Sequence, residues 1–144
     1  MTEIYPPATR RLFPIFRLVF GFAAACFVGA LVTDIVYVEV PDMQWSNFSM
    51  WLITVGLVVA AVAAIVGVVE LAATRPVGWF RTGWALPVGA AAASIVSVFN
   101  AFVHSRDAYQ SVVPTGLTLS IVAVVILLLI PVFERGARPA ARLV

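Results

Sequence analysis

Three polar side chains lie within a stretch of four residues between two long apolar runs: His104, Arg106 and Asp107. His104 is the only histidine, and Asn100 precedes it by four residues. Residues four apart share one face of a helix, so Asn100 and His104 should lie side by side. Side chains of these types can hold helices together, bind a ligand or an electron carrier such as haem, or form part of a docking surface.

The composition sets the surroundings of this group. Of 144 residues, 62% are hydrophobic and 11% are charged, and the mean hydropathy is +1.05. A soluble domain is about 45–50% apolar and about 25% charged. This chain has too little polar surface to cover a water-soluble globule, which predicts an integral membrane protein with the lipid bilayer as its main partner. The arginines flank apolar segments instead of forming a basic patch, so no nucleic-acid partner is expected.

Four apolar segments are long enough to cross a bilayer, whose hydrocarbon core of about 30 Å requires about 20 helical residues. They lie at about 18–38, 48–72, 85–104 and 113–133. The connectors between them are short, and none is long enough to separate two domains. The sequence therefore predicts a single membrane domain over residues 1–144, with an all-α fold: a bundle of four transmembrane helices.

The distribution of arginine predicts the orientation, because cytoplasmic loops carry an excess of basic residues. Eight of the nine basic residues lie on one side of the predicted bundle: Arg10, Arg11, Arg17, Arg75, Arg81, Arg135, Arg138 and Arg142. Arg106 is the exception. We therefore expect both termini to be cytoplasmic, in the cytoplasmic (inner) membrane of a bacterium.

The predicted helices bring one further acid close to the histidine. The first and third segments run in the same direction, so Asp34, near the outer end of the first, should reach the depth of His104. We predict that Arg106 pairs with Asp34 or Asp107. We also predict that His104 faces the interior of the bundle and forms a hydrogen bond with Asn100 or with a carboxylate.

This cluster is interpreted first as a structural lock on the outer ends of the first, third and fourth segments. Ser111 or Thr115 is expected to close the start of the fourth segment. A ligand or electron-carrier site and a docking surface stay open as alternatives. Glu70, at the opposite end of the second segment, is the inner-side candidate and is interpreted as pairing with Arg75 or reaching toward the membrane interface.

Small residues spaced four apart predict which helix faces pack closely in a membrane. In the first segment these are Gly21, Ala25, Gly29 and Thr33, and in the third they are Gly89, Ala93, Ser97 and Ala101. The fourth segment becomes bulky on all sides after Gly116 and Ser120, which predicts that much of its surface faces lipid.

No catalytic motif is recognised. The chain lacks a nucleophile motif, a glycine-rich phosphate loop and metal-ligand spacing. A membrane b-type haem usually takes two histidines, and this chain has one. We therefore predict no cofactor, with haem or quinone at the outer cluster as the alternatives, and no enzymatic activity of its own.

Three stretches resemble a known family: CFVGALVTDIVY, NFSMWLITVGLVVAAVAAIVGVVE and SVFNAFVHSRDAYQSVVPTGLTLS. The chain is similar, over about residues 14–130, to the bacterial membrane proteins grouped as domain of unknown function 2231. The resemblance implies a four-helix membrane protein. Genes of this family are thought to neighbour those of periplasmic quinoprotein sugar dehydrogenases, which implies a redox-associated anchor. Some relatives carry histidines before the first segment, where this chain has RLFPIFRLVFGF, so haem or metal binding there is not implied.

These observations favour a non-catalytic membrane subunit that anchors or supports a larger membrane-associated, redox-linked complex with other membrane or periplasmic subunits. The alternative is a quinone-binding or electron-transfer subunit with its site at the outer cluster. A small transporter ranks third, because no charged residue lies at a predicted midplane.

Overall fold

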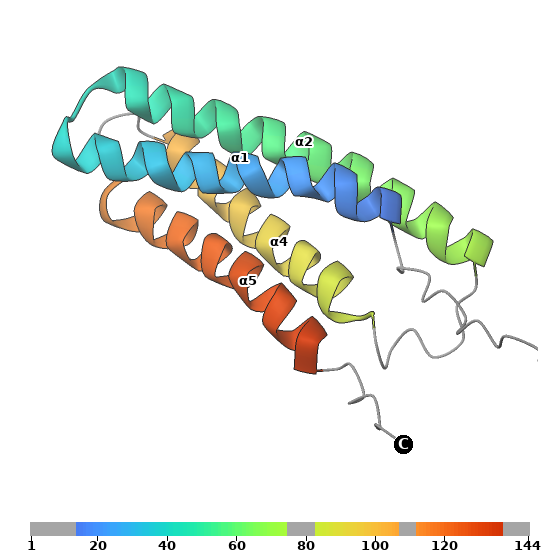
Figure 1. The fold of residues 1–144 in the computed structure, drawn as a ribbon. Coiled ribbons are helices and arrows are strands. Elements are labelled where there is room, and N and C mark those ends of the chain that lie inside the picture. The colour runs from blue at the N-terminus through green and yellow to red at the C-terminus, as the bar shows by residue number, and fades with distance from the viewer. Residues whose placement is uncertain (1–13, 75–82, 107–111, 137–144) are drawn as a thin grey trace, which may run out of the picture.

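The computed structural model describes residues 14–74, 83–106 and 112–136, and nearly all of them are helical. Four long helices follow one another (Figure 1): α1 (Pro14–Glu39), α2 (Met43–Thr74), α4 (Ala85–Arg106) and α5 (Leu117–Gly136). A short, kinked segment, η1 (Val112–Gly116), leads into α5. The described residues include no strand, which confirms the predicted all-α fold.

Each long helix meets the requirements for crossing a bilayer. Four helices of at least 18 residues have sufficiently apolar windows, and α2 has the highest mean hydropathy, 2.9. Two of them begin earlier than predicted, at Pro14 and at Met43. Proline is favoured in the first turn of a helix, and the Asp42 carboxylate accepts a hydrogen bond from the Gln44 backbone N–H at 2.8 Å. These local start signals extend both helices beyond the apolar core that hydropathy detects.

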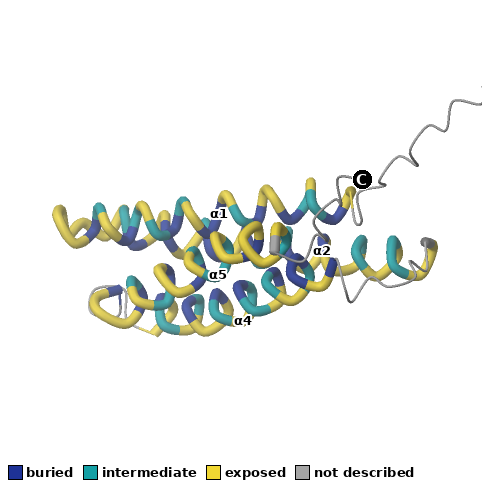
Figure 2. Tube along the Cα trace, turned by 60° about the horizontal axis from the view of Figure 1, so that its bottom comes forward, coloured by how far each residue is buried: buried dark blue, intermediate teal, exposed yellow. Residues whose placement is uncertain are grey.

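The helices form two closely packed pairs. The most extensive contacts join α1 to α2 and α4 to α5, and smaller ones join α1 to α5 and α2 to α4. Buried residues lie on the sides of the helices that face one another, and exposed residues cover the outside (Figure 2). The Arg17 guanidinium forms an ion pair with the Glu134 carboxylate, so the start of α1 and the end of α5 lie at the same end of the bundle.

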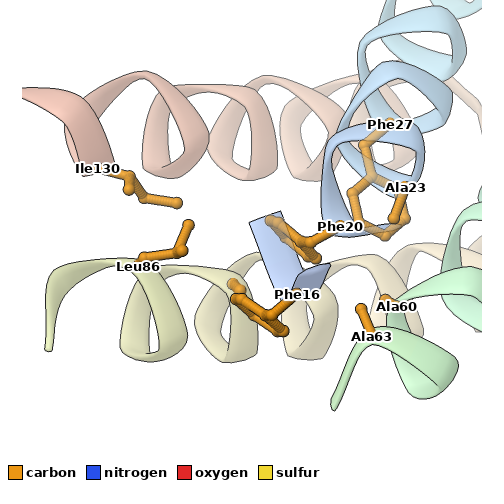
Figure 3. Close-up of a cluster of buried hydrophobic side chains, with 9 residues drawn as sticks. Phe16, Phe20, Ala23, Phe27, Ala60, Ala63, Leu86 and Ile130 are labelled. Carbon is orange, nitrogen blue, oxygen red and sulfur yellow. The ribbon is translucent and has the colours of Figure 1, made fainter. Parts of the chain in front are cut away.

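The hydrophobic core is built around the aromatic side chains of α1. Phe16, Phe20 and Phe27 are at most 5% exposed and pack in one cluster with small or aliphatic residues of the other helices (Figure 3). Those residues are Ala60 and Ala63 of α2, Leu86 and Ala90 of α4, and Ile130 of α5. Phe16 and Phe20 stack with their ring centroids 5.7 Å apart.

The packing face predicted for α1 is correct for half of its residues. Gly29 and Thr33 lie against α2, because a Cβ atom on Gly29 would come within 3.2 Å of an α2 side chain and Thr33 contacts Ser49. Gly21 and Ala25 are exposed, and the buried face of α1 carries the phenylalanines.

Small residues on α2 also permit close approach: a Cβ atom on Gly56 would come within 2.7 Å of the Phe27 ring. Large side chains on one helix thus fit against small ones on another, which satisfies the same packing requirement.

The prediction for the last helix is confirmed. The buried residues of α5 include Ser120, Ala123 and Ile130, whereas Leu128 is 65% exposed and Val132 57%. Large exposed apolar side chains surround the other helices as well, such as Leu18 at 78% and Ile65 at 67%. A surface of this kind is expected where lipid tails replace water.

Candidate functional site

Asp34 lies on α1, close to the end of the helix at Glu39, and its side chain is completely buried. One carboxylate oxygen, Oδ1, lies 3.1 Å from Nε2 of His104 on α4. The other, Oδ2, accepts a hydrogen bond of 2.6 Å from the Ser120 hydroxyl on α5. One buried carboxylate therefore connects three helices.

His104 occupies the last turn of α4 and is 4% exposed. Its second ring nitrogen, Nδ1, lies 3.1 Å from the backbone carbonyl oxygen of Asn100. A carbonyl oxygen can only accept, so Nδ1 must carry the hydrogen. The prediction that His104 faces the interior and bonds Asn100 or a carboxylate is confirmed in both alternatives.

Counting hydrogens on this pair fixes its net charge. Since Nδ1 carries a hydrogen, a single further proton must lie between Nε2 of His104 and Oδ1 of Asp34. The proton can sit on the imidazole, giving an ion pair, or on the carboxyl group, giving two neutral partners. The pair has no net charge in either arrangement. This matters within a membrane, where an unpaired charge at a helix centre costs about 2.5–3.5 kcal/mol on insertion scales.

A chain of hydrogen bonds runs from Asn100 through Ser120 to Asp34, with each group donating to the next. The Asn100 amide nitrogen Nδ2 donates to the Ser120 hydroxyl oxygen at 2.8 Å. The Ser120 hydroxyl in turn donates its hydrogen bond to Asp34. The Asn100 side-chain oxygen Oδ1 is buried and has no hydrogen-bond partner among the described residues. Asp34, Asn100, His104 and Ser120 are each at most 4% exposed and are called the buried cluster below.

A second polar contact lies beside the buried cluster. The hydroxyl oxygens of Thr33 on α1 and Ser49 on α2 are 2.7 Å apart, and Ser49 is fully buried. This contact brings α2 into the same end of the bundle. Sequence reasoning treated Thr33 only as a small packing residue and did not single out Ser49.

Arg106 does not belong to the cluster, contrary to one of the two predicted pairings. Its side chain is exposed at the end of α4, whereas Asp34 is buried and both of its oxygens bind His104 and Ser120. The desolvated partner of Asp34 is thus the imidazole of His104, two residues before Arg106. The other predicted partner, Asp107, lies outside the described residues.

The serine that closes the cluster differs from the two expected. Thr115 is exposed, and Ser111 lies outside the described residues. Ser120, five residues after Thr115, faces the interior instead. The sequence did contain an indication that Ser120 faces the interior, because Gly116 and Ser120 are small residues four apart on an otherwise bulky helix.

Glu70 serves the opposite end of the bundle. Its carboxylate oxygens accept hydrogen bonds from the backbone N–H groups of Ile15, at 2.9 Å, and Phe16, at 3.1 Å. The first N–H groups of a helix lack partners within that helix, and α1 begins at Pro14, which has no N–H. Glu70 of α2 therefore caps α1, while the predicted partner Arg75 lies outside the described residues.

The arrangement can lock helices together. A cavity of about 480 Å³ lies beside α2 and α4, and its lining includes no member of the buried cluster. The described residues contain no group of three or more histidine, cysteine or acidic side chains that could hold a metal ion. Both ring nitrogens of His104 are already engaged within the protein.

Fold and site together define a four-helix integral membrane protein whose helices are joined by buried polar contacts. A family model described as a predicted membrane protein, DUF2231, matches residues 13–141. The chain belongs to this family, which confirms the resemblance seen in the sequence. No curated protein and no solved structure matches the chain.

Proposed function

We propose that the protein is a non-catalytic integral membrane subunit that anchors or supports a larger membrane-associated complex. The observation that carries this proposal is that its buried polar side chains form hydrogen bonds and ion pairs with other helices of the same chain. Asp34, His104 and Ser120 are buried and hydrogen-bonded to one another, and Glu70 and Glu134 bind α1 at the other end. Groups that could do chemistry are thus used to hold helices in place.

The same geometry argues against haem binding. A haem iron ligated by histidine requires a free ring nitrogen, and both nitrogens of His104 face partners within the protein, the Asn100 carbonyl and Asp34. We therefore infer that the isolated chain binds no haem. A pyridine haemochrome assay on purified protein checks this, and stoichiometric haem lost in His104→Ala would show the inference to be wrong.

A quinone site at the buried cluster is the less favoured function. The buried side-chain atom without a partner, Oδ1 of Asn100, is a hydrogen-bond acceptor. The carbonyl oxygens of a quinone are acceptors too and need donors. Among the described residues, no member of the cluster lines the cavity beside α2 and α4. Extraction of a quinone in a one-to-one ratio with the purified chain would reverse this preference.

We propose the cytoplasmic membrane of a bacterium as the location, with both termini in the cytoplasm. The support is the arginine distribution, with eight of nine basic residues predicted on one side. Partners would then be other membrane subunits or periplasmic proteins facing the end that carries the buried cluster.

Affinity purification from native membranes in a mild detergent tests the subunit role. The expected result is recovery of a second protein in a fixed ratio to the tagged chain, retained after mild cross-linking. The variant Asp34→Ala tests whether the subunit role depends on the buried cluster. Removing Asp34 should loosen the outer end of the bundle and reduce recovery of the second protein. A chain recovered alone under cross-linking conditions would contradict the proposal.

A further inference from the structure

The hydrogen bonds of the buried cluster leave room for one more proton. Nδ1 of His104 donates to the Asn100 carbonyl, and a single proton lies between Nε2 and Oδ1 of Asp34. A second proton on this pair gives the same species from either starting arrangement, an imidazolium beside a carboxylic acid. Because Oδ1 then accepts from Nε2–H, the acid hydrogen must lie on Oδ2, which faces the Ser120 hydroxyl at 2.6 Å.

Ser120 can accept that hydrogen only if its own hydroxyl turns away from Asp34. A hydroxyl has one hydrogen to donate and two lone pairs that accept, so Ser120 then needs a new acceptor. Asn100 supplies one, since its side-chain oxygen Oδ1 is buried and has no partner among the described residues. A half-turn of the Asn100 amide would place this oxygen where Nδ2 now lies, 2.8 Å from the Ser120 oxygen.

The half-turn of the Asn100 amide changes the direction of the hydrogen bonds without moving a helix. The two ends of the amide are nearly equal in size, and rotation about its terminal bond is only weakly restricted. The nitrogen takes the place of the oxygen, so one amide atom lacks a partner in both states. The chain from Asn100 through Ser120 to Asp34 then runs from Asp34 through Ser120 to Asn100.

We propose that the buried cluster is a binding site for one additional proton, held by reversal of the hydrogen bonds of Ser120 and Asn100. The proton comes from a hydronium ion, which is left as water, and the net charge of the cluster rises from zero to +1. Acidic and histidine side chains buried among membrane helices commonly form proton pathways. This site goes beyond the subunit role and does not depend on it, because it is a property of the isolated chain.

The proton reaches the site from the end of the bundle where α1 joins α2. Asp34 lies five residues before the last residue of α1, a rise of about 7.5 Å. Two acids and one arginine are exposed at this end and together favour a positive charge nearby: Glu39, Asp42 and Arg106. Tyr37 and Cys26, the other titratable side chains on this part of α1, are buried. The remaining titratable side chains of the described residues lie at the opposite end: Arg17, Glu70, Glu134 and Arg135.

Nuclear magnetic resonance of the full chain in nanodiscs tests the site, because the only histidine gives a single imidazole to observe. Histidine is labelled with nitrogen-15 and aspartate with carbon-13, and the Asp34 carboxyl signal is assigned by its absence in Asp34→Asn. Between about pH 8 and about pH 4, we expect the imidazole and the Asp34 carboxyl to become fully protonated with one common midpoint. The backbone amides of α4 and α5 should stay protected from exchange throughout.

Two results would overturn the site. The first is a folded chain whose His104 and Asp34 signals show no second proton anywhere in this range. The second is proton uptake that occurs only when the α4 and α5 amides lose protection, since the proton would then bind to an opened bundle.

The side-chain amide of Asn100 reports the reversal itself and requires no variant. Its nitrogen donates to Ser120 before proton uptake and has lost that acceptor afterwards. Its nitrogen and hydrogen signals should therefore shift with the midpoint of the imidazole and the carboxyl. Asn100 amide signals that stay constant while the pair takes up the proton would overturn the reversal.

Replacing Asn100 by leucine, which has a similar shape and no polar side-chain atom, should weaken proton binding. Without the extra proton, the variant loses only a donor to a lone pair of Ser120. With the proton, it leaves the Ser120 hydrogen without an acceptor beside a positive charge, which is the greater loss. We expect about tenfold weaker binding, and so a midpoint about one pH unit lower. Phe99→Leu, at the exposed neighbour, is the control and should titrate like wild type. An unchanged midpoint in Asn100→Leu would contradict the proposal.

Discussion

A carboxylate inside a membrane needs a partner for each of its oxygens, and Asp34 finds the two on different helices. His104 and Ser120 supply them, from α4 and α5. Removing one partner of a buried charged pair costs about 3–5 kcal/mol, whereas a hydrogen bond between membrane helices contributes about 0.6 kcal/mol on average. The strength of the cluster therefore depends on whether charge or hydrogen bonding dominates at Asp34.

Replacing Asp34 by asparagine separates these two contributions. With a neutral imidazole, the asparagine amide can donate to Nε2 of His104 while its oxygen still accepts from Ser120. We expect Asp34→Asn to lower the free energy of unfolding by about 1 kcal/mol or less. Asp34→Ala leaves both partners unsatisfied and should cost about 3–5 kcal/mol. Reversible unfolding in mixed detergent micelles measures both, and Ile35→Ala, at an exposed neighbour, is the control.

Equal and large losses in the two variants would show that the negative charge itself is required. That result would favour the ion pair over the neutral arrangement of Asp34 and His104.

Ser120 should matter more than Asn100, because it takes part in two side-chain hydrogen bonds and the Asn100 side chain in one. Ser120→Ala leaves Oδ2 of Asp34 and Nδ2 of Asn100 without their partner, and burying an unsatisfied polar group costs about 1–3 kcal/mol. Asn100→Ala also removes the unpartnered oxygen Oδ1, so its loss should be smaller. Thermal unfolding ranks the two, with Thr118→Ala as the exposed control on α5. The reverse order would mean that Oδ1 binds an additional group.

Part of this cluster could be predicted from sequence. The spacing of Asn100 and His104 fixes their shared helix face, and parallel directions place Asp34 at the same depth. The serine could not be chosen, because the rotation of α5 depends on packing against α4 and α1. Arg106 was misjudged for a physical reason: His104 lies on the interior face of α4 and reaches Asp34, whereas Arg106, two residues further along, lies on an exposed side of the same helix.

At the scale of whole elements, α1 is the helix to which the others are attached. It supplies the aromatic core, and its first N–H groups are capped by Glu70 of α2. Hydropathy was sufficient to find all four helices, since length and apolarity alone define a span. It could not give the packed face of α1, because phenylalanine and glycine are equally compatible with lipid and only the shape of the neighbouring helix decides between them.

The cap on α1 predicts a local effect of Glu70. Glu70→Ala should remove both hydrogen bonds and cost about 1–2 kcal/mol, as loss of a helix cap does. Glu70→Gln keeps one acceptor oxygen and should lose about half of that. Hydrogen exchange at the Ile15 and Phe16 amides should accelerate in both variants. Glu39→Ala, an exposed acid at the other end of α1, should leave these amides unchanged, and unchanged exchange in Glu70→Ala would contradict the cap.

At the scale of the whole molecule, the pairing of Arg17 with Glu134 brings the first and last helices to the same end. The protein should therefore present both termini on one side of the membrane and the connector between α1 and α2 on the other. A reporter fused after Val144 should be active only in the cytoplasm, and one inserted at Pro41 only outside it. Both reporters on the same side would contradict the four-span arrangement.

Among the described residues, the polar contacts between helices involve α1, apart from that of Asn100 with Ser120, and this has a consequence for biosynthesis. α1 leaves the ribosome first, yet its partners arrive later: Glu70 with α2, His104 with α4, and Ser120 and Glu134 with α5. Until the last helix is inserted, Asp34 lacks one donor and Arg17 lacks its carboxylate. Nascent chains stopped before residue 112 should therefore be far more sensitive to membrane proteases than complete ones. Insertion of α5 would then be the step that makes the bundle resistant to proteolysis.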